Sequence, residues 1–193
     1  VDPHRPDCAY PYKDLCGAGV AYKFIRHLYR VMELPWEGED AYMDILALGT
    51  VCDIMPLTDE NRIFVKRGLR RLTNSTNLGI NALKKALGLD GKPIEVHHLS
   101  FRIGPSLNST GRLESAKEGV ELLLTDDPAR AESLAQDMAK LNELRKEMTD
   151  RGVRAATDWV RKDIRMIPTE DGVKEKKIGD DKVIVLYMPG IHE

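Results

Sequence analysis

The chain has 193 residues, of which 42% are hydrophobic and 31% charged, and this balance is typical of a globular protein with a sizeable core. Its formal net charge of −2 excludes binding of a polyanion through overall charge, so any nucleic-acid contact must come from a local basic face. No apolar run approaches the roughly 20 residues that span a bilayer, and we expect no membrane association.

The first part of the chain predicts helices after an extended start. Three prolines within residues 1–13 exclude a regular helix there, and Asp14 is expected to cap a helix over residues 14–34. Apolar residues recur at helical spacing within that range. Further helices are expected over residues 39–50, 59–72, 80–87 and 94–103. The helix over 59–72 opens with two acids, and the helix over 80–87 ends at Gly88.

The second part of the chain predicts one long helix followed by extended structure. Residues 115–124 are helical in pattern, and Asp127 followed by Pro128 then signals the start of a helix that reaches about residue 163. Such a helix measures on the order of 50 Å. Residues 166–177 indicate a loop or hairpin tip, and residues 182–187 a buried strand. The predicted fold class is therefore mainly α.

Two other features bear on the origin of the chain. It begins with Val1 and ends in a loop-like Gly-x-His, from which we expect a fragment of a longer protein. Its cysteines, Cys8, Cys16 and Cys52, show no C-x-x-C spacing, which favours free thiols in a reducing, cytoplasmic compartment over a disulfide framework or a zinc site.

The most informative stretch is residues 101–113, FRIGPSLNSTGRL, called here the Gly/Arg segment. It shows no clean helical or strand period, and it combines glycines, a proline, an amide and arginines, as segments that hold anions do. Arg112 offers a planar fork that matches phosphate oxygens, with Asn108 near it, and Gly111 would let the backbone approach a ligand. A tight turn with an arginine salt bridge is the structural alternative.

A second stretch places an acid inside an apolar run. In residues 47–57, ALGTVCDIMPL, called here the acidic segment, Asp53 would be costly to bury without a partner. A divalent cation is one such partner, and a helix N-terminus or a buried arginine is another. Asp44, on the preceding helix, is expected at the surface.

Two further patterns have weaker chemical readings. His97 and His98 are adjacent, so on a helix their side chains diverge and would rarely share one ion. Arg62, Lys66 and Arg70 lie four residues apart on one helix, with Arg67 and Arg71 beside them, and make a basic face. That face suits either solvent or nucleic acid.

Several separated blocks, in the same order, resemble the RecJ family of the DHH phosphoesterase superfamily. Residues 47–62 resemble its block ALGTVAD-x-x-PL-x-x-ENR, and the Gly/Arg segment resembles F-x-I-G-P-x-LNAAGR. Residues 2–21 look like the family's NP-x-x-x-x-C-x-YP and LAG-x-GVA stretches. Residues 188–193 look like the start of the G-x-H-x-G motif that opens the DHHA1 domain.

The resemblance implies a fold of two domains. An α/β DHH domain is joined by a long helix to a DHHA1 domain, with the active site in the cleft between them. In this chain, residues 1–126 would be the C-terminal part of the DHH domain and residues 127–163 the connecting helix. Residues 164–193 would then be the start of DHHA1, with only its first strand or strands.

The resemblance also implies a function, namely 5′→3′ hydrolysis of single-stranded DNA to mononucleotides in repair and recombination. Two Mn²⁺ or Mg²⁺ ions would activate the attacking water. Asp53 matches a catalytic, metal-binding aspartate. Arg112 matches the position that faces the DNA phosphate, with Asn108 and Gly111 beside it, and His192 matches the histidine of the DHHA1 motif. We expect a monomer whose partner is single-stranded DNA.

The departures from the family pattern limit what this chain does alone. The D-x-D, the next aspartate and the Asp-His-His triad are absent, as is the glycine-rich part of DHHA1, and Ser109-Thr110 replaces Ala-Ala. We therefore expect the isolated chain to be inactive and not to retain a two-metal site. Two alternatives stay open: a phosphoesterase of the same superfamily acting on short oligoribonucleotides or nucleotides, and a non-catalytic binding protein built on the DHH fold.

Overall fold

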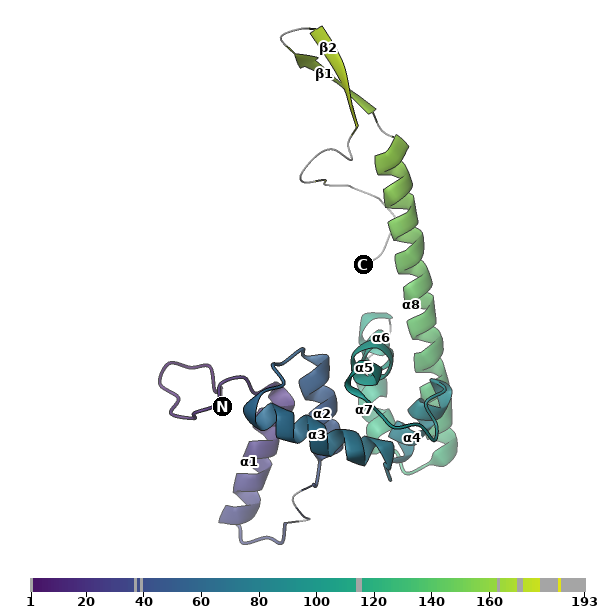
Figure 1. Ribbon diagram of the computed structural model, residues 1–193. Coiled ribbons are helices and arrows are strands. Elements are labelled where there is room, and N and C mark those ends of the chain that lie inside the picture. The colour runs from purple at the N-terminus through teal and green to yellow at the C-terminus, as the bar shows by residue number, and fades with distance from the viewer. Residues whose placement is uncertain are drawn as a thin grey trace. The chain divides into compact units, whose positions relative to one another are not determined.

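The computed structural model describes residues 2–36, 38, 40–113, 116–162, 164–169, 172–177 and 184, with the backbone alone for residues 110–113, 116, 164–169 and 172–177. It divides into two compact units, residues 1–141 and residues 142–193, each described here by itself. Within the described residues, the regular elements are helices and one two-stranded hairpin (Figure 1). The mainly α fold class predicted for this chain is confirmed.

Eight α-helices, one π-helix and two strands are assigned within the described residues. In chain order they are α1 (Gly17–Val31), α2 (Met43–Cys52), α3 (Asp59–Thr73), α4 (Leu78–Ala86), α5 (Val96–His98), η1 (the π-helix Leu99–Ile103), α6 (Gly104–Leu113), α7 (Ala116–Leu124), α8 (Pro128–Lys162), β1 (Ile164–Thr169) and β2 (Gly172–Lys177). The two strands pair antiparallel, with Ile164 opposite Lys177 and Thr169 opposite Gly172.

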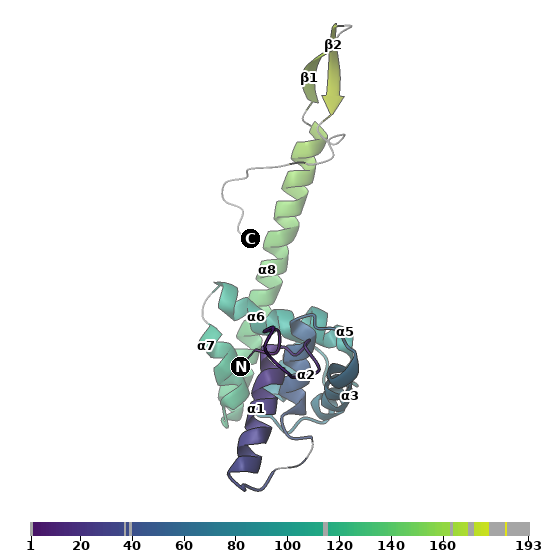
Figure 2. The ribbon, with the colours of Figure 1, turned by 90° about the vertical axis from the view of Figure 1, so that its left-hand side faces the viewer.

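Helix α2 lies at the centre of the N-terminal part of the first unit, between α1 and α3 (Figures 1 and 2). Seven of its ten residues are buried, because its sequence is apolar on all sides. Glycines let its neighbours approach closely. A Cβ on Gly49 would lie 2.8 Å from the Cβ of Ala18 in α1, and one on Gly68 in α3 would lie 2.2 Å from the carbonyl oxygen of Met43. These contacts fix the three helices as one packed layer.

The larger core cluster joins α2 and α3 to the helices that follow. It includes Leu72, Leu99, Leu122 and Met138, each fully buried. The first turns of α8 take part through a stripe that repeats at helical spacing: Ala131, Leu134, Ala135 and Met138. These residues form the buried face of α8 within the first unit.

Several predicted helix limits are confirmed, and others are wrong for identifiable reasons. The helices predicted over 59–72 and 127–163 agree with α3 and α8 to about a residue at each end. Asp14 does not cap α1, whose N-cap is Cys16; instead the Asp14 carbonyl accepts a hydrogen bond of 2.6 Å from Asn61. The helix predicted over 39–50 begins only at Met43, because Tyr42 before it has a left-handed backbone (φ 64°).

The expectation that the Gly/Arg segment is non-helical is also wrong. It starts within η1 and continues without interruption into α6. Pro105, which has no N–H to donate, is the second residue of α6 and lies where the π-helical turn of η1 passes into the α-helix. The turn proposed as the structural alternative for this segment is likewise excluded, since its backbone is helical to Leu113.

The C-terminal expectations are only partly covered by the described residues. The hairpin β1–β2 agrees with the loop or hairpin tip predicted over residues 166–177. The strand predicted over 182–187 lies outside the described residues apart from Ile184, which is 38% exposed and belongs to no strand. All three cysteines are free, as predicted. Within the part of the chain that the structure covers, no helix is long and apolar enough to cross a membrane.

Candidate functional site

Asp53 is the C-cap residue of α2, and the turn that follows it is closed by two backbone hydrogen bonds. The N–H of Ile54 donates to the carbonyl of Val51 at 3.1 Å, and the N–H of Met55 donates to the carbonyl of Thr50 at 3.1 Å. This pair of bonds is a Schellman motif, which satisfies the last carbonyls of a helix. The carboxylate of Asp53 is therefore carried at the end of a well-defined helix.

Ile54 is strained at the position where this motif usually has glycine. Its φ is 55°, in the left-handed region, and for a β-branched residue that conformation is a true outlier. The side chain is 89% exposed, so packing does not compensate the strain. Residues held in such conformations cluster at functional sites, which makes the turn after Asp53 a candidate.

The predicted burial of the two acids on α2 is reversed in the structure. Asp53 is exposed, so the argument that it needs a partner because it is buried is wrong. Asp44, expected at the surface, is 7% exposed, and its Oδ2 lies 3.2 Å from Nε of Arg71 in α3. The compensating charge at Asp44 comes from Arg71, whose side chain is itself 43% exposed, so the pair lies at the edge of the buried region.

The acidic segment and the Gly/Arg segment meet where α2 ends and α6 begins. A Cβ on Gly104 would lie only 2.4 Å from Sγ of Cys52 and 2.8 Å from the carbonyl oxygen of Leu99. Cys52 is partly buried at this contact, and burial, with the adjacent charge of Asp53, raises the pKa of its thiol to about 11. Cys52 is therefore a neutral packing group here, and the residue after it is Asp53.

Asn108 and the predicted phosphate-binding positions follow Gly104 along α6. Positions 104, 108 and 112 are one turn apart and so lie on the same side of the helix, the side that approaches α2 at Gly104. Asn108 is exposed. The backbone of Gly111 and Arg112 lies in the last turn of α6, the Arg112 side chain is outside the described part of the structure, and His192 lies outside the described residues.

Two buried serines fix the register of α6. Ser106 Oγ donates to the carbonyl of Arg102 at 2.9 Å, and Ser109 Oγ donates to the carbonyl of Ser106 at 2.6 Å. Ser109 also lies 3.3 Å from the carbonyl of Met138 in α8. Ser109, which departs from the alanine of the family pattern, therefore tightens the contact between α6 and the first part of α8.

Asn61 fixes the loop after Asp53, and sequence reasoning missed it. This fully buried side chain donates from Nδ2 to the carbonyl of Pro56 at 3.0 Å and to that of Asp14 at 2.6 Å. Tyr12 assists, with its hydroxyl donating to the carbonyl of Thr58 at 3.1 Å. An asparagine among charged residues on a helix gives no signal of burial, although its place in the block ENR hinted at a role.

The site as described supplies one carboxylate and a favourable field for a cation. The C-terminal end of α2 carries the negative end of the helix dipole, so it attracts a cation placed beside Asp53. Among the described residues, however, no three His, Cys, Asp or Glu side chains gather as a metal site would require. The described residues therefore do not fit a complete two-metal site, although Asp53 fits one of its ligands.

The histidine pair contributes to structure. The Nδ1 of His98 accepts a hydrogen bond of 3.1 Å from the backbone N–H of Glu95 and completes a capping box at the start of α5. His97 Nδ1 lies 3.2 Å from the Glu95 carboxylate. Both histidines therefore have Glu95 as a local partner at the start of α5.

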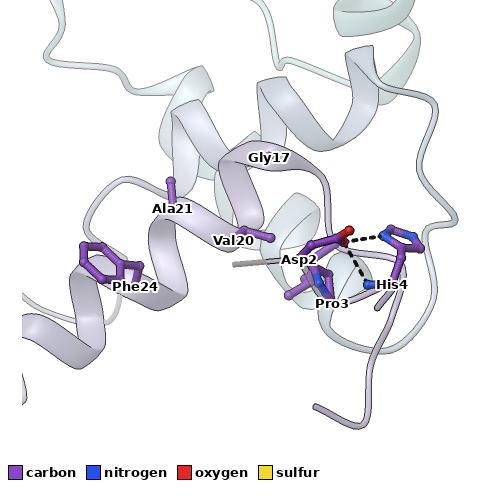
Figure 3. A pocket seen from close by; sticks show the side chains of 8 residues that line it. Asp2, Pro3, His4, Gly17, Val20, Ala21 and Phe24 are labelled. Carbon is purple, nitrogen blue, oxygen red and sulfur yellow. Dashed lines mark hydrogen bonds and ion pairs between the residues drawn. The ribbon is translucent and has the colours of Figure 1, made fainter. Parts of the chain in front are cut away.

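A hollow of about 680 Å³ lies between residues 2–4 and α1 (Figure 3), and none of the predicted site residues lines it. Its walls are largely apolar, including Val20, Ala21 and Phe24. Its polar groups are already engaged with each other, since Asp2 Oδ1 accepts a hydrogen bond of 2.9 Å from the N–H of His4. The hollow brings no catalytic arrangement together.

Comparison with known proteins gives matches over most of this chain. The single-stranded-DNA-specific exonuclease RecJ of Bacillus subtilis is 38% identical over 160 residues, which cover 83% of this chain and 20% of the relative. RecJ of Thermus thermophilus is 40% identical over 134 residues, which cover 69% of this chain and 19% of the relative. No protein-family model matches the chain.

The fold gives the same result. The crystal structure of RecJ from Thermus thermophilus in complex with Mn²⁺ superimposes with a TM-score of 0.70 at 34% identity, covering 81% of this chain and 23% of that one. The corresponding Mg²⁺ complex gives a TM-score of 0.68 at 35% identity, covering 78% and 23%. These findings make the chain similar, in sequence and in its helical fold, to a segment of the RecJ exonucleases. The chain spans about a fifth of the length of the curated relatives it matches.

Proposed function

We propose that this chain is the central segment of a longer RecJ-type exonuclease that degrades single-stranded DNA from its 5′ end to mononucleotides. The longer protein uses two Mn²⁺ or Mg²⁺ ions and acts as a monomer in the cytoplasm, in DNA repair and recombination. The observation that carries the proposal is the contact of Gly104 with Cys52, because it joins the acidic segment to the Gly/Arg segment. The isolated chain is inactive, because it supplies only part of the metal site.

Each predicted site residue has a role in this proposal. Asp53 is one carboxylate ligand of the metal site, held at the negative end of α2 by the closed turn after it. Arg112, with Asn108 one turn earlier, binds a phosphate of the strand, and Gly111 lets the strand approach the helix. His192 belongs to the wall contributed by the DHHA1 domain. When bound, the metal ions supply an activated water.

The domain division follows from the same reading. Residues 1–126 are the C-terminal part of the DHH domain, and residues 127–163, which contain α8, connect it to the DHHA1 domain that starts at residue 164. The length of α8, 35 residues or about 52 Å, supports a connecting role. The curated relatives that the chain matches are named as exonucleases specific for single-stranded DNA, which favours this function over the two alternatives.

The experiment uses the full-length protein with Asp53→Asn, which keeps the shape of the side chain and removes its charge. We expect Mn²⁺-dependent digestion of a 5′-labelled single strand to fall by at least about two orders of magnitude, as loss of an electrostatic contact at a reacting centre does. Mn²⁺ binding, measured by calorimetry without DNA, should weaken in parallel.

A matched control separates this effect from loss of charge in general. Asp158→Asn removes an exposed carboxylate from α8 and should leave both digestion and Mn²⁺ binding unchanged. If the Asp53 variant digested DNA at the wild-type rate, the metal assignment would be wrong. Wild-type protein that cleaved dinucleotides but not long single-stranded DNA would instead favour the small-nucleotide phosphoesterase.

A further inference from the structure

The outer side of α3 carries a line of cations that the candidate site does not use: Arg62, Lys66 and Arg70, called here the basic row. We infer that the basic row is a second contact surface for single-stranded DNA, leading away from the loop that follows Asp53. This inference rests on the proposed function and adds a binding surface for the same substrate.

The geometry of the basic row suits an extended polyanion. Its three residues are four apart in one helix, so they lie on one side, about 6 Å from one to the next along the axis. All three side chains are exposed. That spacing is of the same order as the spacing of successive phosphates in an extended single strand, and charged surfaces that track such a strand bind it without reading its bases.

The neighbouring cations of α3 have partners, whereas the side chains of the basic row have none in the described part of the chain. Arg67 lies 3.6 Å from Asp40 Oδ1, and Arg71 lies 3.2 Å from Asp44 Oδ2. No hydrogen bond or ion pair joins the side chain of Arg62, Lys66 or Arg70 to any residue that the structure describes. Asp40 and Asp44 therefore compensate the positive charge of Arg67 and Arg71, whereas the charge of the basic row is available to a ligand.

The packing of α3 fixes its orientation and keeps the basic row at the surface. Its opposite side is buried through Asn61, Phe64, Val65, Gly68 and Leu72. The close approach of Gly68 to the backbone of Met43 leaves no room for rotation, because a Cβ there would already lie 2.2 Å from the Met43 carbonyl oxygen. The basic row is thus held outward by the packing of α3 on α2.

The basic row begins at the loop that follows the candidate metal ligand, since the backbone N–H of Arg62 donates to the carbonyl of Thr58 in that loop. Arg62 follows Asn61, whose amide is bonded to the carbonyl of Pro56 in the loop that starts at Asp53. A strand with its end near Asp53 could therefore continue along α3. Phe64 is the aromatic residue of α3 and is buried, so the row offers charge without base stacking and should bind irrespective of sequence.

The test uses the full-length protein and the triple variant R62Q/K66Q/R70Q. Binding of an oligothymidine of about 30 nucleotides is measured by anisotropy over a range of salt concentrations, with a strand of about four nucleotides as the short probe. Each phosphate contact to a single strand contributes about 0.7 to the slope of log affinity against log salt, so losing three should make the slope shallower by about 2. Affinity for the long strand should fall on the order of tenfold to a hundredfold at about 0.1 M salt.

A control variant removes the same total charge elsewhere in the first unit. R26Q/R30Q/K92Q neutralises three exposed cations of α1 and of the segment before α5, and should leave the salt slope unchanged. Turnover of the short strand should be the same in wild type and in R62Q/K66Q/R70Q, and so should the melting temperature. An unchanged slope in R62Q/K66Q/R70Q, or an equal change in the control, would overturn the inference.

Other results are equally decisive. Loss of turnover on both strand lengths in R62Q/K66Q/R70Q would contradict a remote binding role, and capture of an acidic protein with unchanged DNA affinity would assign the row to a protein partner instead. Failure of the proposed function is distinguishable, because the wild-type protein would then digest neither strand.

Discussion

Replacing Gly104 by alanine tests the contact on which the candidate site is built. The new Cβ would lie 2.4 Å from Cys52 Sγ and 2.8 Å from the Leu99 carbonyl oxygen, whereas ordinary contacts begin at 3.4 Å. The end of α2 and the start of α6 must therefore move apart by about 1 Å. Overpacking of this kind costs about 1–3 kcal/mol, and the better helix propensity of alanine offsets up to about 1 kcal/mol.

We therefore expect Gly104→Ala to lower the free energy of unfolding of this chain by about 1–2 kcal/mol, or the melting temperature by about 2–8 °C. Circular dichroism during thermal unfolding measures this. In the full-length protein, the same shift displaces Asp53, which adjoins Cys52. Because a misplacement of about 1 Å can cost about a hundredfold in rate, Mn²⁺-dependent digestion should fall by much more than the loss of stability alone would cause.

Two further variants make the reasoning refutable. Gly17→Ala should not destabilise the chain, because its Cβ would meet no atom within 4 Å. Adding Cys52→Ala to Gly104→Ala removes the sulfur and should restore part of the stability, while the contact with the Leu99 carbonyl remains. If Gly104→Ala were as stable and as active as wild type, the packing of the two segments described here would be incorrect.

Three other predictions concern single side chains, and thermal unfolding of the chain measures each. Ile54→Gly should raise the free energy of unfolding by about 0.5–1 kcal/mol, because relief of the left-handed strain exceeds the entropy that glycine adds to the unfolded chain. The control Ile63→Gly, at an exposed position inside α3, should lower it by about 1 kcal/mol. A destabilised Ile54→Gly would contradict the strain argument. Asn61→Leu should cost about 2–4 kcal/mol, since the carbonyls of Asp14 and Pro56 lose their donor, and the exposed Asn74→Leu should change little. Lys84→Met should cost about 1–3 kcal/mol, because Lys84 Nζ donates to the carbonyls of Leu72 and Thr73 at the end of α3. Burial lowers the pKa of Lys84, with Asp90 opposing, so the unfolded chain binds more protons between that lowered pKa and the ordinary value of 10.5. Wild-type stability should therefore rise with pH across this window relative to Lys84→Met, and parallel pH profiles would refute the assignment.

Elements with strong local signals could be predicted from the sequence. The acids Asp59 and Glu60 begin α3, and Asp127 with Pro128 marks the start of α8, because these residues satisfy or tolerate free N–H groups at a helix start. Their limits depend on chemistry within one turn.

The features that sequence could not provide depend on partners distant in the chain. Asp44 is buried beside Arg71, 27 residues later, and the carbonyl of Asp14 accepts a hydrogen bond from Asn61, 47 residues away, while α1 begins only at Gly17. The same limit applies to Asp53. Its place in an apolar run suggested burial, whereas the helix ends at that residue and leaves the carboxylate exposed.

The helical form of the Gly/Arg segment changes how its glycines should be understood. Two glycines and a proline in this short segment suggested a loop in which backbone groups bind an anion. In a helix, those backbone groups are already hydrogen-bonded and are not free to bind an anion, and Gly104 instead brings α6 against Cys52. Asn108 and the backbone of Arg112 follow Gly104 along α6 at intervals of four residues, so the segment carries these positions on a helix and not on a loop.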